Sequence, residues 1–249
     1  MLSINILLEK VHTSTNLLKS YLCVQLSTDL DNKSKIHKWL KYLALLNIVA
    51  VVLYIVYLNN VVIKSFSKPI TTEGYTYSYE SQPIELINML LIIEDQAFFK
   101  HIGIDFKEIL RVIRDHYLYQ KPIRGASTIT QQLIKNTLLS REQTMSRKLK
   151  EAIMATLLEL SFEKEYILNR YMNTVYLGQD KGKSINGFAN ASYFYFSKPI
   201  ESLSLEEMAS LVALLKGPSY FNPDKYPQRL RKRTKLVLSL YKKYKKIVN

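Results

Sequence analysis

Residues Met89–Phe99 read MLLIIEDQAFF, an apolar run that ends in two adjacent carboxylates and two aromatic rings. The apolar side chains before the carboxylates recur every three or four residues, as on one face of a helix (Ile84, Ile87, Leu90 and Leu91). The pattern predicts a helix that ends at Glu94 and Asp95 in apolar surroundings. Buried carboxylates are uncommon without a partner or a chemical task, so Glu94 is a candidate general base. The alternative is a structural carboxylate paired with Lys100 or His101.

Composition narrows the fold class. The 249 residues are 47% hydrophobic, which is enough for a packed core and excludes a chain that is disordered for lack of apolar residues. Seven glycines and seven prolines are few, and long stretches lack turn signals, so a mainly α-helical protein is expected and a β-sandwich is disfavoured. The lone cysteine, Cys23, excludes an intrachain disulfide and a multi-cysteine metal site.

Positive charge is concentrated near the C-terminus. Lys and Arg number 35 against 21 Asp and Glu, a formal net charge of +14, and residues 225–246 are rich in these bases and contain no acid. Such a patch can face nucleic acid, anionic lipid or solvent, and composition does not choose among these partners.

Residues 42–63, YLALLNIVAVVLYIVYLNNVVI, contain no charged side chain. As a helix they reach roughly 33 Å at about 1.5 Å per residue, enough to cross the hydrocarbon core of a bilayer. We expect one transmembrane helix; the alternative is a buried core helix, which would normally show a polar face. Lysines crowd residues 33–41, and the bias of positive charge toward the cytoplasm therefore places the N-terminus inside. The segment starts too late and is too long for a cleavable signal peptide.

This span divides the chain into four expected parts. Residues 1–41 form a cytoplasmic N-terminal segment, residues 42–63 the membrane helix, residues 64–81 a neck, and residues 82–249 one domain. The neck is polar and rich in tyrosine, and its pattern fits a linker or a strand pair. The part after the neck is periodic and mostly helical, so the chemistry is expected there.

A polar cluster follows the first predicted helix. Residues 125–136, GASTITQQLIKN, place a run of hydroxyls and amides ahead of Lys135. Ser127 is a good helix N-cap, and the N-terminus of the helix that it opens offers free amides to an anion. A cap explains Ser127 alone and leaves the rest of the cluster without a structural reason.

The next predicted helix, near residues 144–160, carries Arg147, Lys148 and Glu151. Arg147 and Glu151 are four residues apart and share a face, so a solvated ion pair is one interpretation. The other is a pyrophosphate clamp, in which the cations bind the phosphate oxygens and Glu151 orients them or holds a divalent ion.

The remaining segments predict helices with various faces. Residues 109–119 form a basic amphipathic segment, which suits a membrane interface and an ordinary amphipathic helix about equally. Asn173 and Gly178 fit a helix end. Ser204 with Glu207 forms a capping box at the start of an apolar helix, which is expected in the core.

Taken in order, these fragments resemble the motifs of the peptidoglycan glycosyltransferase family (glycosyltransferase family 51). The matching residues, in chain order, are Glu94, Asp95, Phe98, His101, Gly103, Gly125, Ser127–Gln132, Arg147, Lys148, Glu151, Ile167, Leu168, Tyr171, Met172, Asn173, Gly178, Arg233, Thr234, Val237 and Leu238. The chain departs from the family pattern where Asn169 replaces a Glu, Met172 a Leu and Thr234 an Arg. Gln143 stands where many members have an Arg, and Arg141 is the nearest substitute for that cation.

The resemblance implies a mainly α, lysozyme-like, monofunctional transglycosylase that joins lipid II units into β-1,4-linked glycan strands. The reaction inverts the anomeric carbon and releases polyprenyl diphosphate. By resemblance, Glu94 is the base and Glu151 the second catalytic acid. The implied substrate-binding residues are Asp95, Phe98, His101, Ser127, Thr128, Gln131, Gln132, Lys135, Arg147, Lys148 and Asn173. A divalent cation, Mg²⁺, is implied as the cofactor, and an organic cofactor is not expected.

The implied partners are lipid II, the nascent glycan strand, plasma-membrane lipids, and transpeptidases or other cell-wall synthesis proteins, with no nucleic acid. The implied location is a single pass through the bacterial plasma (inner) membrane, with the domain on the outer side. Two rivals remain. A lysozyme-like muramidase could share the fold and Glu94, and a non-catalytic membrane scaffold is suggested by the departures at Gln143, Asn169 and Thr234.

Overall fold

The computed structural model describes residues 38–70, 74–122, 125–140 and 142–244. The chain divides into two units, one up to Tyr57 and one from Leu58 onward. Of the first unit, the structure describes only residues 38–57, so Cys23 and the expected cytoplasmic segment up to residue 37 lie outside the described residues. Arg141 also lies outside them.

One long helix, Lys38–Phe66, contains the predicted membrane span. It has 29 residues and is long and apolar enough to cross a membrane. Its side chains from residue 38 to Tyr57 are exposed, which argues against the alternative of a buried core helix. Within the second unit, the last turns of this helix bury Leu58 and Phe66 completely.

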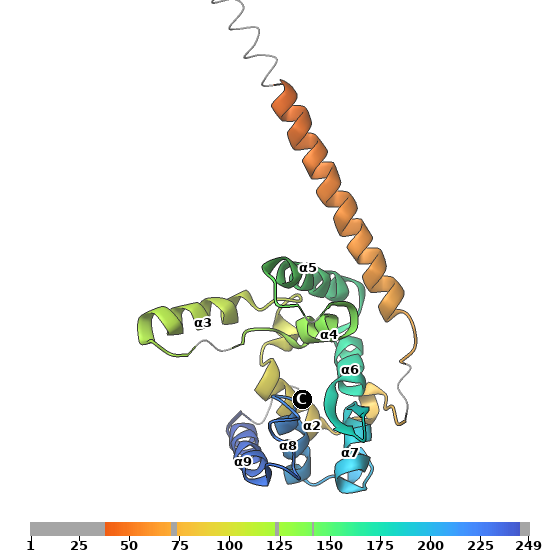
Figure 1. The fold of residues 1–249 in the computed structure, drawn as a ribbon, viewed down its shortest axis with the longest axis vertical. Helices are drawn as coiled ribbons and strands as arrows, with labels where there is room; N and C mark the ends of the chain where they lie inside the picture. Colours follow the sequence, from red (N-terminus) through yellow and green to blue (C-terminus); the bar gives the residue numbers. More distant parts are fainter. Residues whose placement is uncertain (1–37, 71–73, 123–124, 141, 245–249) are drawn as a thin grey trace, which may run out of the picture. The chain divides into compact units, whose positions relative to one another are not determined.

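The second unit is mainly α-helical, as predicted (Figure 1). Its elements are η1 (Tyr79–Ser81), α2 (Ile84–Glu94), η2 (Phe98–Lys100), α3 (Phe106–Tyr119), α4 (Ile129–Leu138), α5 (Met145–Ser161), α6 (Lys164–Thr174), β1 (Tyr176–Asp180), β2 (Lys183–Asn186), α7 (Phe188–Phe196), η3 (Ile200–Ser202), α8 (Leu205–Leu214) and α9 (Pro227–Tyr244).

Helix α2 forms the centre of this unit. Every side chain from Leu86 to Ile92 is buried, because α2 packs against α8 and α9 (Figure 1). The helix ends at Glu94, as the sequence predicted, and the backbone N–H of Asp95 donates the last hydrogen bond of the helix to Leu91 O, at 2.9 Å. A helix that is apolar on all sides thus delivers two carboxylates to one end of the core.

Helices α4, α5 and α6 lie on the other side of α2. Helix α4 packs against both α5 and α6. The hydroxyl of Thr144 caps α5 by accepting from Arg147 N–H at 3.2 Å, so α5 begins where the sequence predicted. The predicted capping box of Ser204 and Glu207 is present at the start of α8, and the body of that helix is buried.

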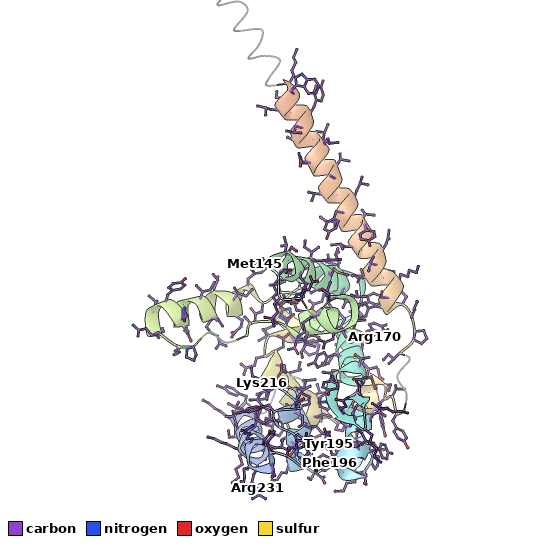
Figure 2. All side chains as sticks on the ribbon, viewed as in Figure 1. Met145, Arg170, Tyr195, Phe196, Lys216 and Arg231 are labelled. Carbon is purple, nitrogen blue, oxygen red and sulfur yellow. The ribbon has the colours of Figure 1, made fainter. Side chains whose placement is uncertain are left out.

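Arg170, labelled on α6 in Figure 2, fastens the end of the long helix and the start of the neck. Its guanidinium donates to the backbone oxygens of Phe66 and Lys68, at 3.3 Å and 2.5 Å, and lies over the Phe66 ring. Tyr166 donates to the same Phe66 oxygen. A cation is favourable at a helix C-terminus, where carbonyl groups lack partners inside the helix. Of the predicted neck, residues 64–66 belong to the long helix and residues 79–81 form η1, and its described part contains no strand.

Helix α3 extends away from the other helices (Figure 1). Asp105 caps it by accepting from Glu108 N–H at 2.9 Å, and it ends at Gln120, whose φ is 49°. The helix is amphipathic, as predicted for residues 109–119, but much of its apolar side is exposed (Phe106, Leu110, Ile113, Tyr117 and Leu118). In a water-soluble protein such a surface marks a contact with a partner or a membrane.

The antiparallel hairpin β1–β2 was not predicted. Gly178, expected at a helix end, lies in β1, because α6 already ends at Thr174. The turn uses Lys181 and Gly182, with φ of 43° and 89°, which is the backbone that tight hairpin turns require. The sequence signal was therefore the pair Lys181-Gly182 between two short polar strands.

Alanine substitution at two glycines tests how tightly α7 is fitted against α6. Gly187 has φ +82°, and an added Cβ would lie 2.5 Å from Asn173 O, whereas Gly182 has φ +89° and open space around it. Both Gly182→Ala and Gly187→Ala store backbone strain of about 1–3 kcal/mol, and only Gly187→Ala adds a clash with backbone. We expect Gly187→Ala to lower the thermal unfolding midpoint clearly more than Gly182→Ala, as measured by circular dichroism in one detergent. Equal midpoints would contradict the described fit.

Candidate active site

Glu94 is oriented by a neutral side chain. Gln132 Nε2 donates to Glu94 Oε2 at 2.9 Å, and the Gln132 Oε1 accepts from the Tyr171 hydroxyl at 3.0 Å. Tyr171 is buried, and burial, with the nearby charge of Glu94, holds its pKa well above the usual range, so it remains a proton donor to Gln132. An amide orients the carboxylate without cancelling its charge, which is what a general base requires.

Arg233 lies close enough to Glu94 for the charge of Glu94 to affect its pKa. Burial lowers the pKa of Arg233, and the charge of Glu94 opposes this shift. Its Nε donates to Ala213 O at 3.2 Å, and its guanidinium lies over the Phe221 ring. Helix α9 therefore brings Arg233, one of the residues that match the family motifs, toward the end of α2.

Glu151, by contrast, is bound by two cations. Its side chain is 2% exposed, and its oxygens contact Arg147 Nη1 at 2.7 Å and Lys148 Nζ. Lys148 Nζ also donates to Ser127 Oγ at 2.8 Å. The Arg147–Glu151 pair is largely shielded from water, which excludes the interpretation as a solvated ion pair. Glu151 carries one negative charge, so one of the two positive charges beside it is left uncompensated by Glu151. We call Arg147, Lys148 and Glu151 the cation cluster.

The cation cluster opens into a cleft of about 1180 Å³. Met145, labelled at the start of α5 in Figure 2, belongs to its wall. Six residues predicted to be in the site line it: Ser127, Gln132, Lys135, Arg147, Lys148 and Glu151. Glu94 is not one of the lining residues, but it is one hydrogen bond away from the cleft, because its carboxylate accepts from the lining residue Gln132.

Sequence analysis missed one wall of the cleft. Tyr176, Gln179, Ser184 and Asn186, all from the β1–β2 hairpin, line it together with Gln143 of the loop before α5. Hydroxyl and amide groups of this kind bind sugars through hydrogen bonds. The hairpin turn was the signal that could have located these residues.

The residues present do not fit a resident divalent ion at Glu151. Both of its oxygens already contact cations, and a third positive charge there would be repelled. Among the described residues, no group of three or more His, Cys, Asp or Glu side chains is arranged to hold a metal.

Several other predicted substrate-binding residues are buried beside the cleft and bonded to the protein itself. Thr128, not Ser127, caps α4, and it forms a capping box with Gln131. The prediction of Ser127 as the cap was wrong by one residue, because the Ser127 side chain faces Lys148 instead. Asn173 is buried, accepting from the Tyr77 N–H at 3.0 Å and donating to the Tyr77 oxygen at 2.9 Å.

Asp95, Phe98 and His101 lie in the loop after α2, and all three make internal contacts. Asp95 is buried; it accepts from Ile129 N–H at 3.0 Å and contacts His101 Nε2 at 3.1 Å. The alternative pairing of a helix-end carboxylate with His101 is thus realised by Asp95 and leaves Glu94 free of it. The Phe98 ring is fully buried, with Lys164 Nζ 4.4 Å from its centroid.

His101 is a cation at neutral pH. Burial opposes its protonation, but the hydrogen bond with Asp95 and the nearby carboxylate of Glu159 outweigh burial and raise the pKa of His101 to about 9. The same contacts with His101 and Lys164 hold the pKa of Glu159 below its usual range, against the effect of burial. The loop after α2 is therefore held by charges buried next to Glu94.

This fold and this site define a lysozyme-like class of enzyme, with a helix-end carboxylate beside a cationic cleft. The transglycosylase family model matches residues 59–242. Among curated relatives, penicillin-binding protein 1B of Haemophilus influenzae is 42% identical over 168 residues, which is 68% of this chain and 22% of the relative. Penicillin-binding protein 1B of Escherichia coli is 43% identical over 158 residues, 64% of this chain and 19% of the relative.

Penicillin-binding protein 1A of Aquifex aeolicus is 41% identical over 161 residues, 65% of this chain and 22% of the relative. The chain thus spans about a fifth of the length of these relatives. It belongs to the transglycosylase family, the peptidoglycan glycosyltransferases of family 51.

The pKa of His101 predicts a pH dependence of folding stability. An unfolded histidine has a pKa of about 6.5, and the folded-state pKa is about 9. The stability that the imidazolium contributes is therefore fully present below about pH 6.5 and is lost as the pH rises through about 9. We expect the midpoint of denaturant unfolding to fall over this window, and His101→Gln to flatten the fall.

His116→Gln, at an exposed histidine of α3, is the matched control and should keep the slope of the parent. A parent protein whose stability does not change across the window, or a control that behaves like His101→Gln, would show that His101 is not held as a cation.

Proposed function

We propose that this chain polymerises lipid II into β-1,4-linked glycan strands with release of polyprenyl diphosphate. One observation carries the proposal: Glu151, which lines the cleft, and Glu94, which is bonded to the cleft residue Gln132, have opposite surroundings. Glu94 has a neutral amide as its partner, and Glu151 has two cations. The first arrangement suits a base and the second suits the binding of a diphosphate leaving group.

The proposed chemistry needs one base. The 4-hydroxyl of the acceptor sugar attacks the anomeric carbon of the donor from the face opposite the diphosphate, and Glu94 takes the hydroxyl proton. The new C–O bond forms as the bond to the diphosphate breaks, and the bonding electrons leave on a phosphate oxygen. Attack from the opposite face turns the α linkage of the donor into a β linkage.

The cation cluster lowers the barrier by stabilising the leaving group. Charge develops on the diphosphate as the bond breaks. Preorganised cations in a cleft stabilise this developing charge more than they stabilise the bound substrate. Arg147, Lys148 and the exposed Lys135 are the proposed donors, and Glu151 fixes the directions of the first two. The hairpin residues, Gln179 and Asn186 among them, would bind the sugars.

Among the described residues, one helix, Lys38–Phe66, is long and apolar enough to span a bilayer. We infer that the N-terminus is cytoplasmic, from the lysines in residues 33–41, and that the domain works on the outer side of the bacterial plasma membrane. The apolar face of α3 is the proposed contact with lipid around the prenyl tail. Nascent strands and transpeptidases remain proposed partners, and nucleic acid is not expected on that side.

The alternative function is that of a muramidase, and the cations Arg147 and Lys148 argue against it. Water attack on an existing glycan strand releases no diphosphate, so it gives Arg147 and Lys148 no anion to bind. Incubation of the full chain with labelled lipid II in vesicles, followed by separation of the products, decides between the two. Polymer supports the proposal; muropeptides released from isolated cell wall support the rival; neither product supports a non-catalytic scaffold.

Glu94→Gln should nearly abolish polymerisation. Glutamine keeps the size and polarity of the side chain but cannot accept the hydroxyl proton, and loss of a general base typically costs about 10²–10⁴ in rate. Turnover of labelled lipid II is compared at matched thermal stability. Glu85→Gln makes the same change at the first turn of α2 and should leave the rate unchanged. Near-parent turnover by Glu94→Gln would remove Glu94 from the mechanism.

Gln143→Arg should tighten the binding of lipid II. Gln143 is exposed at the wall of the cleft, so a cation there can reach the diphosphate but stays near water. A charge in such a place contributes about 1 kcal/mol, which is roughly fivefold in affinity. Gln228→Arg adds the same charge at an exposed position of α9 and serves as the control. An affinity unchanged by Gln143→Arg, or raised equally by both variants, counts against a diphosphate at this wall.

A further inference from the structure

Two charged residues outside the family motifs contact the loop that follows α2 and are largely shielded from solvent. Glu159 of α5 has a side chain 2% exposed, and Lys164 at the start of α6 has a side chain 20% exposed. Their charged atoms are 2.7 Å apart. Desolvation of two charges is costly, so such a pair stays in place only if further contacts satisfy it.

Glu159 makes two contacts with the loop and one with α4. One carboxylate oxygen accepts from the backbone N–H of Gly103 and lies 3.8 Å from His101 Nδ1, while the other accepts from the hydroxyl of Thr130 on α4. Lys164 contacts the same loop, because its Nζ lies over the Phe98 ring. Glu159 therefore ties α5 and α6 to both the loop and α4.

His101 passes this connection on to the residue next to the proposed base. Its Nε2 lies 3.1 Å from Asp95, and Asp95 accepts from the Ile129 N–H at the start of α4 at 3.0 Å. Asp95 follows Glu94 directly in the chain. A continuous path of charged contacts thus runs from Lys164 through Glu159, His101 and Asp95 to the backbone of Glu94.

The path is electrically balanced. The charged groups that face His101 are Asp95 from the end of α2, Glu159 from α5 and Lys164 from α6. Two carboxylates are matched by the lysine and by a protonated imidazole, so loss of the His101 proton leaves an uncompensated negative charge in the interior. We call these four residues the buried ion path.

We propose that Glu159 and Lys164 are positioning residues for the reaction, which hold the Glu94 carboxylate at the cleft through His101 and Asp95. A base displaced by about 1 Å can lose about 10²-fold in rate even when the substrate still binds. The cation cluster makes no described contact with the buried ion path, so binding of the diphosphate and placement of the base are separable.

The kinetic test uses the full chain and rests on the proposed function. Glu159→Gln should lower kcat by about 10- to 100-fold while KM for lipid II changes little. Lys164→Met should act in the same direction, and Lys164→Arg, which keeps the charge, should recover most of the parent rate. Glu165→Gln, an exposed neighbour on α6, is the matched control. Parent-like kcat in Glu159→Gln, or a loss in KM alone, would overturn the inference.

A second test reads the buried ion path without any substrate. The titration of His101 is followed by NMR of histidine-labelled protein in detergent, with its resonance assigned by its loss in His101→Gln. Removal of an anionic partner in Glu159→Gln should lower the pKa of His101, whereas removal of a cationic neighbour in Lys164→Met should raise it. Opposite shifts separate this electrostatic connection from general loosening of the fold.

The two tests fail in different ways. If the parent chain makes no polymer from lipid II, the proposed function is wrong and the NMR titrations alone decide whether the path exists. If the parent polymerises but both variants titrate as the parent does, Glu159 and Lys164 do not act on His101 and the positioning role is wrong.

Discussion

The site depends on one constraint: a helix buried on every side has to end in two carboxylates. Helix α2 has no solvent-facing stripe in its central turns, so Glu94 and Asp95 arrive at the edge of the core together. Asp95 accepts hydrogen bonds from the backbone of α4 and contacts a cationic histidine. With Asp95 satisfied inside, Glu94 is the carboxylate left to bind Gln132 at the cleft wall, so two adjacent carboxylates have different surroundings.

A second carboxylate with fixed partners, Glu151, lines the cleft. The cations that bind Glu151 come from its own helix, three and four residues before it, so α5 carries a preassembled charged surface whether or not substrate is present. Gln132 on α4 joins the two regions, because it binds Glu94 and lines the cleft. Rigid helices therefore set the separation of Glu94 and the cation cluster, and the hairpin β1–β2 lines one wall of the cleft.

Sequence reasoning succeeded where local chemistry decides the structure. The end of α2, the start of α5 and the capping box of α8 follow from residues within one helical turn of each other. It failed where long-range packing decides. Ser127 and Thr128 are equally good caps in isolation, and only the position of Lys148 on another helix turns Ser127 toward the cleft. The burial of Glu159 likewise depends on His101 and Lys164, which no local pattern connects.

Helix α3 carries most of its apolar side chains outward and has few neighbours among the described elements. Its folding free energy therefore depends on the medium that covers that face, and not on the core around α2. The thermal stability measured for this chain therefore depends on the detergent or lipid that surrounds it. The same polypeptide extracted with two different detergents would therefore differ in how much of α3 is helical.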